Sequence, residues 1–304
     1  MPNPHIALGL WPIAGITTVG VSANDAEQTM VAALESGITT FDTAFSYGYE
    51  GESDQILGTQ IKGQRESYTV IGKVGQRWNG NRERVIDGTR QSLIADAETS
   101  LRRMNLEYFD TLMLHSPDPN VALEKSAEAI AVLQQRGLCH RTGVCNVNTT
   151  QLKKFQSVLK CDAIQCPLNL MQRESLTDLV PHCQKSDTEV YTFWTLMKGL
   201  LAGKIRRDHK FAEGDSRPGY AIFQGAARER AHQIVDGMNR IAEEAGLTTA
   251  QLVIGWVLSQ PGINMALVGG HKPDQIRETA LARPLSPLLC NAIDQLVVET
   301  GSTS

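Results

Sequence analysis

Residues 24–43, NDAEQTMVAALESGITTFDT, contain a helix pattern and a strand pattern in direct succession. We predict a helix over Asn24–Ser36, because apolar residues recur on one face at Met30, Ala33 and Leu34. Gly37 follows and is typical of a helix end. The short run Thr39–Thr43 then predicts a buried strand. A strand that alternates with a packed helix is the building unit of α/β proteins.

The same alternation extends along the chain in both directions from this segment. A second helix is predicted to begin at Thr248–Gln251, a capping-box pattern, and to end at Gln260–Gly262. Several predicted strands carry apolar residues on consecutive positions, as parallel strands covered on both faces do. The predicted strands are Ile6–Trp11, Thr39–Thr43, Tyr68–Val74, Phe109–His115, Arg141–Asn146, Ala163–Pro167, Val190–Leu196 and Met265–Gly269. Eight strands separated by helices predict an α/β fold, a closed (β/α)8 barrel, with residues 1–304 as one domain.

Composition narrows the classes of partner. The formal net charge is −4 and the charges are interspersed, so we expect neither nucleic acid nor a membrane to be the main partner. The six cysteines form no CxxC pair and no zinc spacing, which indicates a reduced, cytoplasmic protein without a metal site. The apolar stretch Tyr191–Gly203 is too short to cross a bilayer. The longest irregular connection, Asp208–Gln224, is a candidate lid.

Four residues with acid–base side chains lie at or just after the predicted strand ends, where the active sites of such barrels are found. They are Asp42, Tyr47, Lys73 and His115. A Lys⁺ beside a tyrosine favours the phenolate, so we expect Lys73 to lower the pKa of Tyr47. Asp42 can neutralise Lys73, and His115 can donate a hydrogen bond to a carbonyl oxygen. Hydride must come from a cofactor, because no side chain delivers it.

Other interpretations remain open at this point. An Asp–Lys pair is more often structural than catalytic, and His115 is also compatible with a core histidine. A Schiff-base enzyme that uses Lys73 as its nucleophile is a further alternative, since barrels host such lysines.

Several stretches, in chain order, resemble motifs of the aldo-keto reductase family. They are Phe41–Gly48 (FDTAFSYG), Gly72–Gly75 (GKVG), Ser100–Asp118, Gly143–Asn146 (GVCN), Ile164–Gln165 and Asn169–Leu170. The resemblance covers about Ile6 to Ala282. It implies an oxidoreductase that interconverts an aldehyde or ketone, such as an aldose, and its alcohol. Asp42, Tyr47, Lys73 and His115 match the catalytic positions of that family. Folds of this family also serve as cofactor-sensing regulatory subunits, which is the alternative function.

The resemblance implies a nicotinamide cofactor bound without a GxGxxG fingerprint, which this sequence lacks. It places Asn146 and Gln165 at the carboxamide and Phe193 against the ring of the nicotinamide. The pyrophosphate is expected at a glycine-rich turn that otherwise reads as a plain strand-to-helix junction. The further positions assigned to the cofactor in this part of the chain are Trp11, Leu196, Gly199, Leu201, Gly203 and Lys204.

The run Gly269–Glu278 is similar to the adenosine end of the family's site. Its assigned positions are Gly270, His271, Lys272, Gln275 and Glu278. His271 stands where the family has an arginine for the 2′-phosphate, and a neutral histidine holds a phosphate less well. Because Lys272 can compensate, NADP(H) is the first candidate and NAD(H) the second.

The substrate pocket is expected among aromatic side chains near the strand ends. Phe45, Trp78 and Trp194 are the candidate substrate contacts, together with Trp11. The sequence predicts a small-molecule carbonyl or alcohol substrate and does not choose among aldehydes, ketones and sugars.

Overall fold

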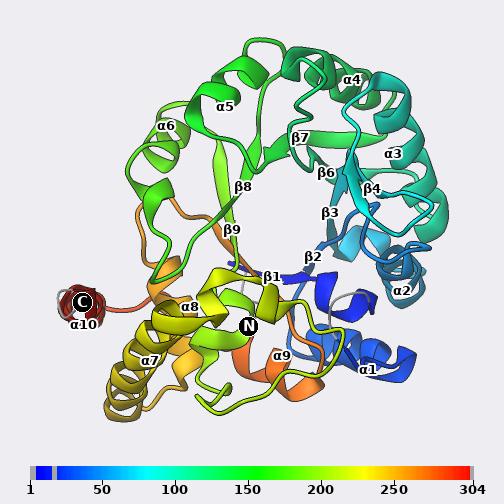
Figure 1. Ribbon diagram of the computed structural model, residues 1–304. Helices are drawn as coiled ribbons and strands as arrows, with labels where there is room; N and C mark the ends of the chain where they lie inside the picture. Colours follow the sequence, from blue (N-terminus) through cyan, green and yellow to red (C-terminus); the bar gives the residue numbers. More distant parts are fainter. Residues whose placement is uncertain (1–4, 16–18, 302–304) are drawn as a thin grey trace.

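The computed structural model describes residues 5–15 and 19–301 of the chain. Within these residues, eight parallel strands close into a barrel in the order β1-β10-β9-β8-β7-β6-β3-β2 (Figure 1). The strands are β1 (Ile6–Gly9), β2 (Thr40–Asp42), β3 (Thr69–Val74), β6 (Phe109–Leu114), β7 (Cys139–Cys145), β8 (Ala163–Pro167), β9 (Glu189–Phe193) and β10 (Met265–Val268). The predicted (β/α)8 barrel is therefore confirmed.

Two predicted strands extend too far at their carboxyl ends. Ile6–Trp11 stops at Gly9, because Trp11 opens a 3-10 helix, η1 (Trp11–Ala14), whose second residue is proline. Val190–Leu196 stops at Phe193, because Trp194 has a left-handed φ of 58° that a strand cannot contain. Both corrections fall at the end of the barrel where the strands point towards the candidate site.

Ten α-helices surround the barrel in the described part of the chain. They are α1 (Ala23–Glu35), α2 (Glu52–Gln60), α3 (Arg90–Met104), α4 (Leu123–Gln135), α5 (Thr149–Gln156), α6 (Leu179–Lys185), α7 (Gly225–Ala245), α8 (Thr249–Leu258), α9 (Pro273–Thr279) and α10 (Pro287–Gly301). Both helices predicted from capping and periodicity are present. Capping boxes begin α1 at Ser22 and α8 at Thr248, in the latter case with Gln251 as predicted.

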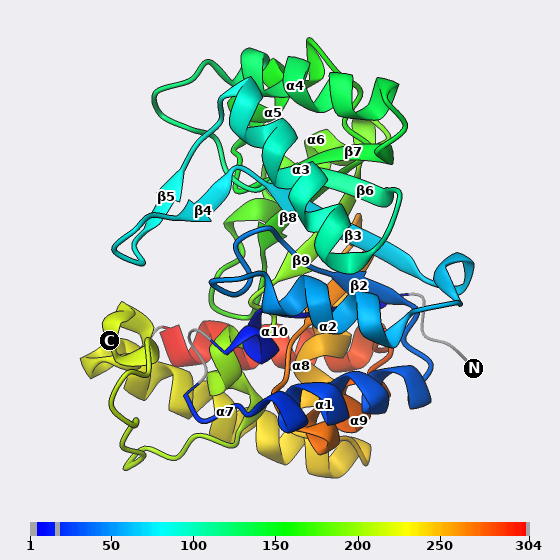
Figure 2. The ribbon, with the colours of Figure 1, turned by 90° about the vertical axis from the view of Figure 1, so that its right-hand side faces the viewer.

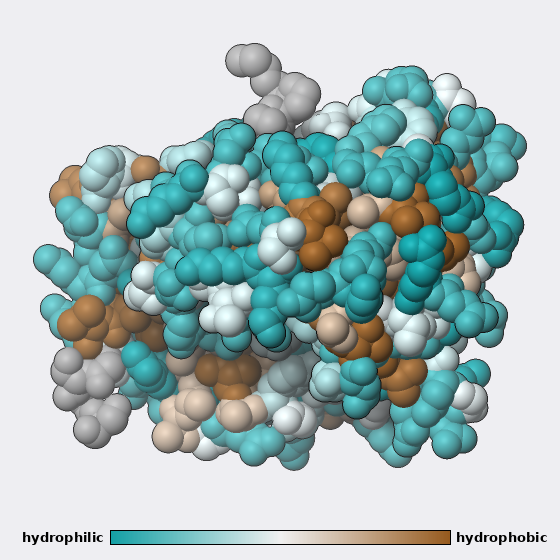
Figure 3. Space-filling view, turned by 90° about the horizontal axis from the view of Figure 1, so that it is seen from above, coloured by the Kyte–Doolittle hydropathy of each residue, from teal (hydrophilic) through white to brown (hydrophobic). Residues whose placement is uncertain are grey.

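The apolar core has two parts, one inside the barrel and one between the strands and the helices. The interior contains Ala7, Ile71, Met113, Cys145, Ala163, Tyr191 and Leu267. The outer layer holds the largest fully buried side chains, among them Trp256, Phe41, Phe109 and Phe155. On the face that carries α4 and α5, hydrophilic residues surround separate small apolar patches (Figure 3). The helices thus turn their apolar faces inward, as amphipathic helices in globular proteins do.

Three segments extend the barrel. An antiparallel hairpin follows β3 and consists of β4 (Gln76–Trp78) and β5 (Arg84–Ile86). The connection Asp208–Gln224 contains two short 3-10 turns, η5 (Arg217–Gly219) and η6 (Ala221–Phe223). Hairpin and connection project from the same side of the barrel (Figure 2). Helix α10 packs on α7, where Leu296 lies against Gly237.

Across residues 5–15 and 19–301, none of the helices combines the length and apolar character needed to span a membrane.

Candidate active site

The alternation of side chains along the strands places the candidate residues at the mouth of the barrel. Residues two apart on a strand share a face. Lys73 lies two residues beyond the interior residue Ile71, and Gln165 lies two beyond Ala163. His115 likewise follows the interior residue Met113 at the end of β6. These side chains therefore form the layer directly above the apolar interior.

Lys73 and Asp42 form a buried ion pair in this layer. Lys73 Nζ lies 2.5 Å from Asp42 Oδ1, and the two side chains are only 2% and 3% exposed. The ammonium also donates to the Tyr47 hydroxyl at 3.1 Å and to the Thr43 carbonyl at 3.1 Å. Gln165 Nε2 donates to the second Asp42 oxygen at 2.6 Å. Both charges are thus paired and hydrogen-bonded, which a buried ion pair requires.

Tyr47 reaches this pair from the loop between β2 and α2. The loop is held from both sides, since Tyr47 N donates to the Ala44 carbonyl at 2.9 Å and Ser53 Oγ donates to the Tyr47 carbonyl at 2.9 Å. The Tyr47 ring lies edge-on to Trp11, with ring centroids 5.1 Å apart. The phenol is therefore fixed by its backbone and by its ring before any ligand binds.

A second buried carboxylate anchors the same loop, and sequence reasoning missed it. Asp54 accepts hydrogen bonds from Thr43 Oγ1 at 2.7 Å and from Ser100 Oγ at 2.5 Å, and Arg103 lies 3.9 Å away. Arg103 also donates to the Phe45 carbonyl at 3.2 Å. Burial raises the pKa of Asp54 to about 6, although the two hydroxyls and Arg103 lower it. No local pattern reveals this contact, because Asp54 and Ser100 meet only through the packing of α2 on α3.

His115 lies next to Tyr47 and is uncharged near neutral pH. The two rings are 5.8 Å apart at their centroids. Burial lowers the pKa of His115 well below its usual value, and the positive charges of Lys73 and Arg84 lower it further. Asn146 Nδ2 donates to the His115 carbonyl at 2.8 Å and thereby fixes the end of β6. A neutral imidazole in this position can donate a hydrogen bond without adding a charge.

The predicted pKa shift of Tyr47 is wrong in direction. Lys73 lowers the pKa of Tyr47 as expected, but burial of the phenolate is the larger effect, and the pKa is raised overall. For Lys73, burial alone would lower the pKa, yet the charges of Asp42 and Tyr47 raise it well above its usual value. Lys73 is therefore protonated, which removes the lone pair that a Schiff-base nucleophile needs.

The structure places the residues assigned to the nicotinamide around this cluster. Phe193 ends β9 two residues beyond the interior residue Tyr191, and its ring is partly exposed. Asn146 is exposed at the end of β7 and has a left-handed φ of 58°. The amide nitrogens of Asn146 and Gln165 already have protein partners, His115 and Asp42. An aromatic face and amide oxygens beside the cluster of Asp42, Tyr47, Lys73 and His115 fit a nicotinamide ring and its carboxamide.

The glycine-rich turn after β9 forms an open backbone cradle. It is a 3-10 segment, η4 (Met197–Ala202), interrupted by left-handed residues at Lys198 and Gly199. A Cβ at Gly199 would find no atom closer than 3.8 Å, so other residues do not crowd the backbone at this glycine. The Leu196 carbonyl closes the turn by accepting hydrogen bonds from the backbone amides of Gly199 at 2.9 Å and Leu201 at 3.1 Å, and the Leu201 side chain is fully buried. Gly203 ends the turn with a φ of 74°. This cradle fits the pyrophosphate assigned to it.

The residues assigned to the adenosine end gather at the start of α9. Gln275 Oε1 accepts a hydrogen bond from the His271 backbone at 3.0 Å, and Gly270 is buried beneath them. Lys272 is exposed. Glu278 Oε1 is buried, accepts no hydrogen bond from the described residues and lies 3.7 Å from Lys204 Nζ. An unsatisfied buried acceptor is typical of a site that awaits a donor such as an exocyclic amine.

The candidate substrate aromatics lie in three different environments. Trp78 is held by a hydrogen bond from its indole nitrogen to the Ser46 carbonyl at 2.9 Å. Trp194 is 38% exposed and lies edge-on to Tyr220 of the Asp208–Gln224 connection. The Phe45 ring is half-buried, and the guanidinium carbons of Arg77 and Arg103 lie 5.6 Å and 4.8 Å from its centre. Phe45, Trp78 and Trp194 all remain candidate substrate contacts.

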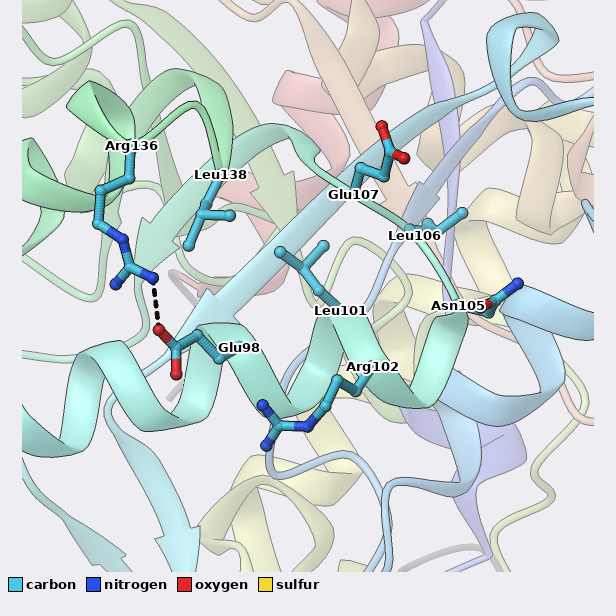
Figure 4. Close-up of a pocket in the computed structure, with 8 residues that line it drawn as sticks. All are labelled: Glu98, Leu101, Arg102, Asn105, Leu106, Glu107, Arg136 and Leu138. Atoms are coloured by element: carbon cyan, nitrogen blue, oxygen red, sulfur yellow. Dashed lines mark hydrogen bonds and ion pairs between the residues drawn. The ribbon is translucent and has the colours of Figure 1, made fainter.

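A surface pocket also opens far from this cluster. It lies beside the end of α3 and the connection from α4 to β7, where the strands begin (Figure 4). Its lining residues are Glu98, Leu101, Arg102, Asn105, Leu106, Glu107, Arg136 and Leu138. Arg136 and Glu98 form an ion pair at 2.6 Å at its edge. In a (β/α)8 barrel this end contributes to stability rather than to catalysis.

Comparison with known proteins agrees with the fold. A sequence model described as the aldo/keto reductase family matches residues 5–298. An aldo-keto reductase of Bacillus subtilis, YhdN, is 32% identical over 275 residues, which are 90% of this chain and 82% of that protein. An NADH-specific methylglyoxal reductase of Escherichia coli is 26% identical to this chain, and the match covers 91% of this chain and 89% of that protein.

Among solved structures, a glycerol dehydrogenase from Gluconobacter oxydans has a TM-score of 0.89 and 30% sequence identity. The match covers 98% of this chain and 93% of that protein. The likeness in sequence thus extends over the whole barrel and includes every strand end that carries the cluster of Asp42, Tyr47, Lys73 and His115. On these grounds the chain belongs to the aldo/keto reductase family.

Proposed function

We propose that this enzyme interconverts an aldehyde or ketone and the corresponding alcohol, with Tyr47 as the group that exchanges the proton. The observation that carries the proposal is the 3.1 Å hydrogen bond from Lys73 Nζ to the Tyr47 hydroxyl, at the mouth of the barrel and beside a neutral His115. A phenol that is fixed next to a permanent positive charge can release a proton to a substrate and regain it later.

The proton transfer follows from the charges around Tyr47. The raised pKa keeps the phenol protonated at neutral pH, so it is ready to protonate a carbonyl oxygen that accepts hydride. The phenolate that forms is stabilised by the Lys73 ammonium at 3.1 Å. Asp42 and Gln165 hold the ammonium in place. His115 donates a hydrogen bond to the same carbonyl oxygen and orients it.

The hydride is supplied by a nicotinamide cofactor when it is bound. Phe193 would stack on the ring, and Asn146 and Gln165 would contact the carboxamide through their oxygens. The cradle formed by Lys198 and Gly199 would receive the pyrophosphate. At the adenosine end, Glu278 would accept a hydrogen bond from the adenine amine, since its Oε1 has no hydrogen-bond donor among the described residues and only Lys204 Nζ, 3.7 Å away, as a charged partner.

NADP(H) is our first candidate for the cofactor and NAD(H) the second. Lys272 gives the adenosine end an exposed positive charge, which favours a 2′-phosphate. Two observations favour NAD(H) instead. Burial and the charge of Lys272 lower the pKa of His271, so that it is neutral. Hydrogen bonds from Ser22 lower the pKa of Asp25, and Lys272 lowers it further, so a carboxylate lies close enough to Lys272 to offset part of its charge.

Three further features complete the proposal. The substrate is a small carbonyl or alcohol compound, and no nucleic acid is involved, in keeping with the formal net charge of −4. The six free cysteines support a reduced, cytoplasmic location. We treat residues 1–304 as one domain.

The first test is a titration of the purified protein with NADPH and with NADH, followed by a panel of aldehydes. Binding followed by aldehyde-dependent oxidation of the cofactor supports the reductase. Binding without turnover would point instead to a cofactor-sensing subunit on the same fold. If neither cofactor binds, the proposed function is wrong.

A further inference from the structure

An arginine on the β4–β5 hairpin lies at the rim of the candidate site. Arg84 opens β5, and its guanidinium carbon lies 4.6 Å from the ring centre of Trp11 and 5.1 Å from that of Trp78. Trp11 in turn contacts the Tyr47 ring at 5.1 Å. The guanidinium is therefore one aromatic ring away from the group that we propose as the proton donor.

This guanidinium has ring contacts but no anionic partner among residues 5–15 and 19–301. The nearby carboxylates of the same segment are engaged elsewhere. Glu83 accepts a hydrogen bond from Asn79 Nδ2 at 2.8 Å, and Asp87 accepts hydrogen bonds from Ser92 and Thr89. Cation–π contact uses the faces of the guanidinium plane and leaves the N–H donors at its edge free. Arg84 thus presents an unpaired set of donors at the rim.

The charge of Arg84 acts on the groups that surround the mouth of the barrel. It contributes to lowering the pKa of His115, after burial and Lys73. Partial burial lowers the pKa of Arg84 itself, while Tyr47 and Tyr220 raise it. Tyr220 belongs to the Asp208–Gln224 connection, which projects from the same side of the barrel as the hairpin (Figure 2). Arg84 is therefore near enough to both Tyr47 and Tyr220 for their charges to act on its pKa.

We propose that Arg84 binds an anionic group of the substrate, so that the enzyme prefers carbonyl compounds that carry a carboxylate or a phosphate. The proposal rests on the proposed function, because it assumes that the carbonyl lies at Tyr47 and His115. Trp11 and Trp78 hold the guanidinium in place, and a fork of N–H donors in a fixed plane matches the oxygens of either anion. Fixing the donors before binding reduces the entropy lost on binding.

The same geometry has a purely structural explanation, in which Arg84 only clamps the hairpin to Trp11. The substitution Arg84→Gln tests between the two, because the structural explanation makes no distinction between charged and neutral substrates. Arg82→Gln is the matched control. Arg82 is on the same hairpin, and among the described residues the ring that its guanidinium contacts is that of Tyr49, 4.6 Å away, rather than Trp11 or Trp78. Arg84→Lys retains the charge and loses the planar fork.

The probes are two pairs of aldehydes that differ in charge. Succinic semialdehyde is compared with butanal for the carboxylate, and glycolaldehyde phosphate with glycolaldehyde for the phosphate. The measured quantity is the ratio of kcat/KM for the charged aldehyde to that for its neutral partner. We expect this ratio to fall by about tenfold to a hundredfold in Arg84→Gln for the preferred anion, the usual range for a lost charged hydrogen bond. It should fall less in Arg84→Lys and stay unchanged in Arg82→Gln.

The pair of aldehydes whose kcat/KM ratio falls in Arg84→Gln shows whether Arg84 binds a carboxylate or a phosphate. The proposal is overturned if the wild-type enzyme turns over both members of each pair equally well, or if Arg84→Gln lowers them by the same factor. Absence of turnover with every aldehyde would instead refute the proposed function. Thermal unfolding and cofactor binding are measured on each variant, so that a misfolded Arg84→Gln is recognised and Arg84→Lys then decides the question.

Discussion

The substitution Tyr47→Phe tests the centre of the site with little disturbance of the fold. It removes one hydroxyl and keeps the ring, whose centre lies 5.1 Å from that of Trp11 and 4.6 Å from Lys73 Nζ. Lys73 loses one hydrogen-bond acceptor but keeps Asp42 and the Thr43 carbonyl. No buried charge is left without a partner. We therefore expect a change in the free energy of unfolding of only about 0.5–1.5 kcal/mol, the usual contribution of one hydrogen bond.

The effect on catalysis should be much larger. A positioned acid–base group contributes about 10²- to 10⁴-fold to the rate, which corresponds to roughly 3–6 kcal/mol at about 1.4 kcal/mol per tenfold change. In Tyr47→Phe no other group takes over the proton, because Lys73 is paired with Asp42 and His115 is neutral. We expect kcat/KM for aldehyde reduction to fall by this factor. Cofactor affinity should stay close to that of the wild type, since the hydroxyl is engaged by Lys73 rather than by the cofactor positions.

The assay follows NADPH oxidation under kcat/KM conditions, and cofactor affinity is measured separately by fluorescence titration. Tyr108→Phe is the matched control, because the Tyr108 hydroxyl contacts Glu66 at 3.1 Å on the outside of the barrel. The control should keep full activity. If Tyr47→Phe retains the wild-type kcat/KM while it binds cofactor normally, the assignment of the proton donor is wrong. If cofactor affinity falls in parallel with activity, the hydroxyl has a binding role instead.

Two further substitutions test the surroundings of Tyr47, and a third tests the adenosine end of the site. Lys73→Met leaves Asp42 buried without its positive partner, so urea unfolding should show a free energy of unfolding lower by about 3–5 kcal/mol. A decrease of less than about 1 kcal/mol would contradict the buried ion pair. Burial raises the pKa of Asp54 in the folded state to about 6, above its usual value of about 3.9. Between about pH 4 and pH 6 the folded protein therefore holds a proton that the unfolded chain has lost, and the free energy of unfolding of the wild type falls as the pH rises through this interval. Asp54→Asn lacks this titration, and its stability relative to the wild type should therefore increase over that interval; a pH-independent difference would refute the shift. His271→Arg replaces a neutral side chain by a permanent cation and should raise the NADPH-to-NADH ratio of kcat/KM, whereas an unchanged ratio would exclude His271 from the 2′-phosphate site.

The parts of the molecule that could be predicted from the sequence depend on short-range patterns. Asp42 ends a short run rich in β-branched and aromatic residues, which are typical of strands, so its position at a strand end follows from the run itself. Because the carboxyl ends of all eight strands meet at one side of the barrel, residues distant in sequence such as Lys73 and His115 could be expected to lie close together. The fold and the location of the cluster could therefore be predicted from the sequence.

The features that escaped prediction depend on long-range packing or on burial. The contact of Asp54 with Ser100 requires the placement of α2 on α3. Arg84 meets Trp11 only because the hairpin folds back over the barrel mouth. The hairpin itself had a local signal, since Asn79-Gly80 is a common turn dipeptide and lies between its two strands. The direction of the Tyr47 pKa shift could not be predicted without knowing how deeply the phenol is buried, because burial raises the pKa and Lys73 lowers it.

The distribution of charge around the site separates two tasks. Lys73 and Asp42 neutralise each other, while Tyr47 and His115 are both neutral near pH 7, so the buried cluster has no net charge before the reaction. A phenolate that forms there meets the Lys73 ammonium at hydrogen-bond distance and in a buried environment, where the attraction is stronger than in water. Arg84 lies outside this pair, accessible to solvent, and its charge is not needed to hold the cluster together. A cation that the proton chemistry does not require is free to act on the substrate, which is why its effect should appear in selectivity between charged and neutral aldehydes.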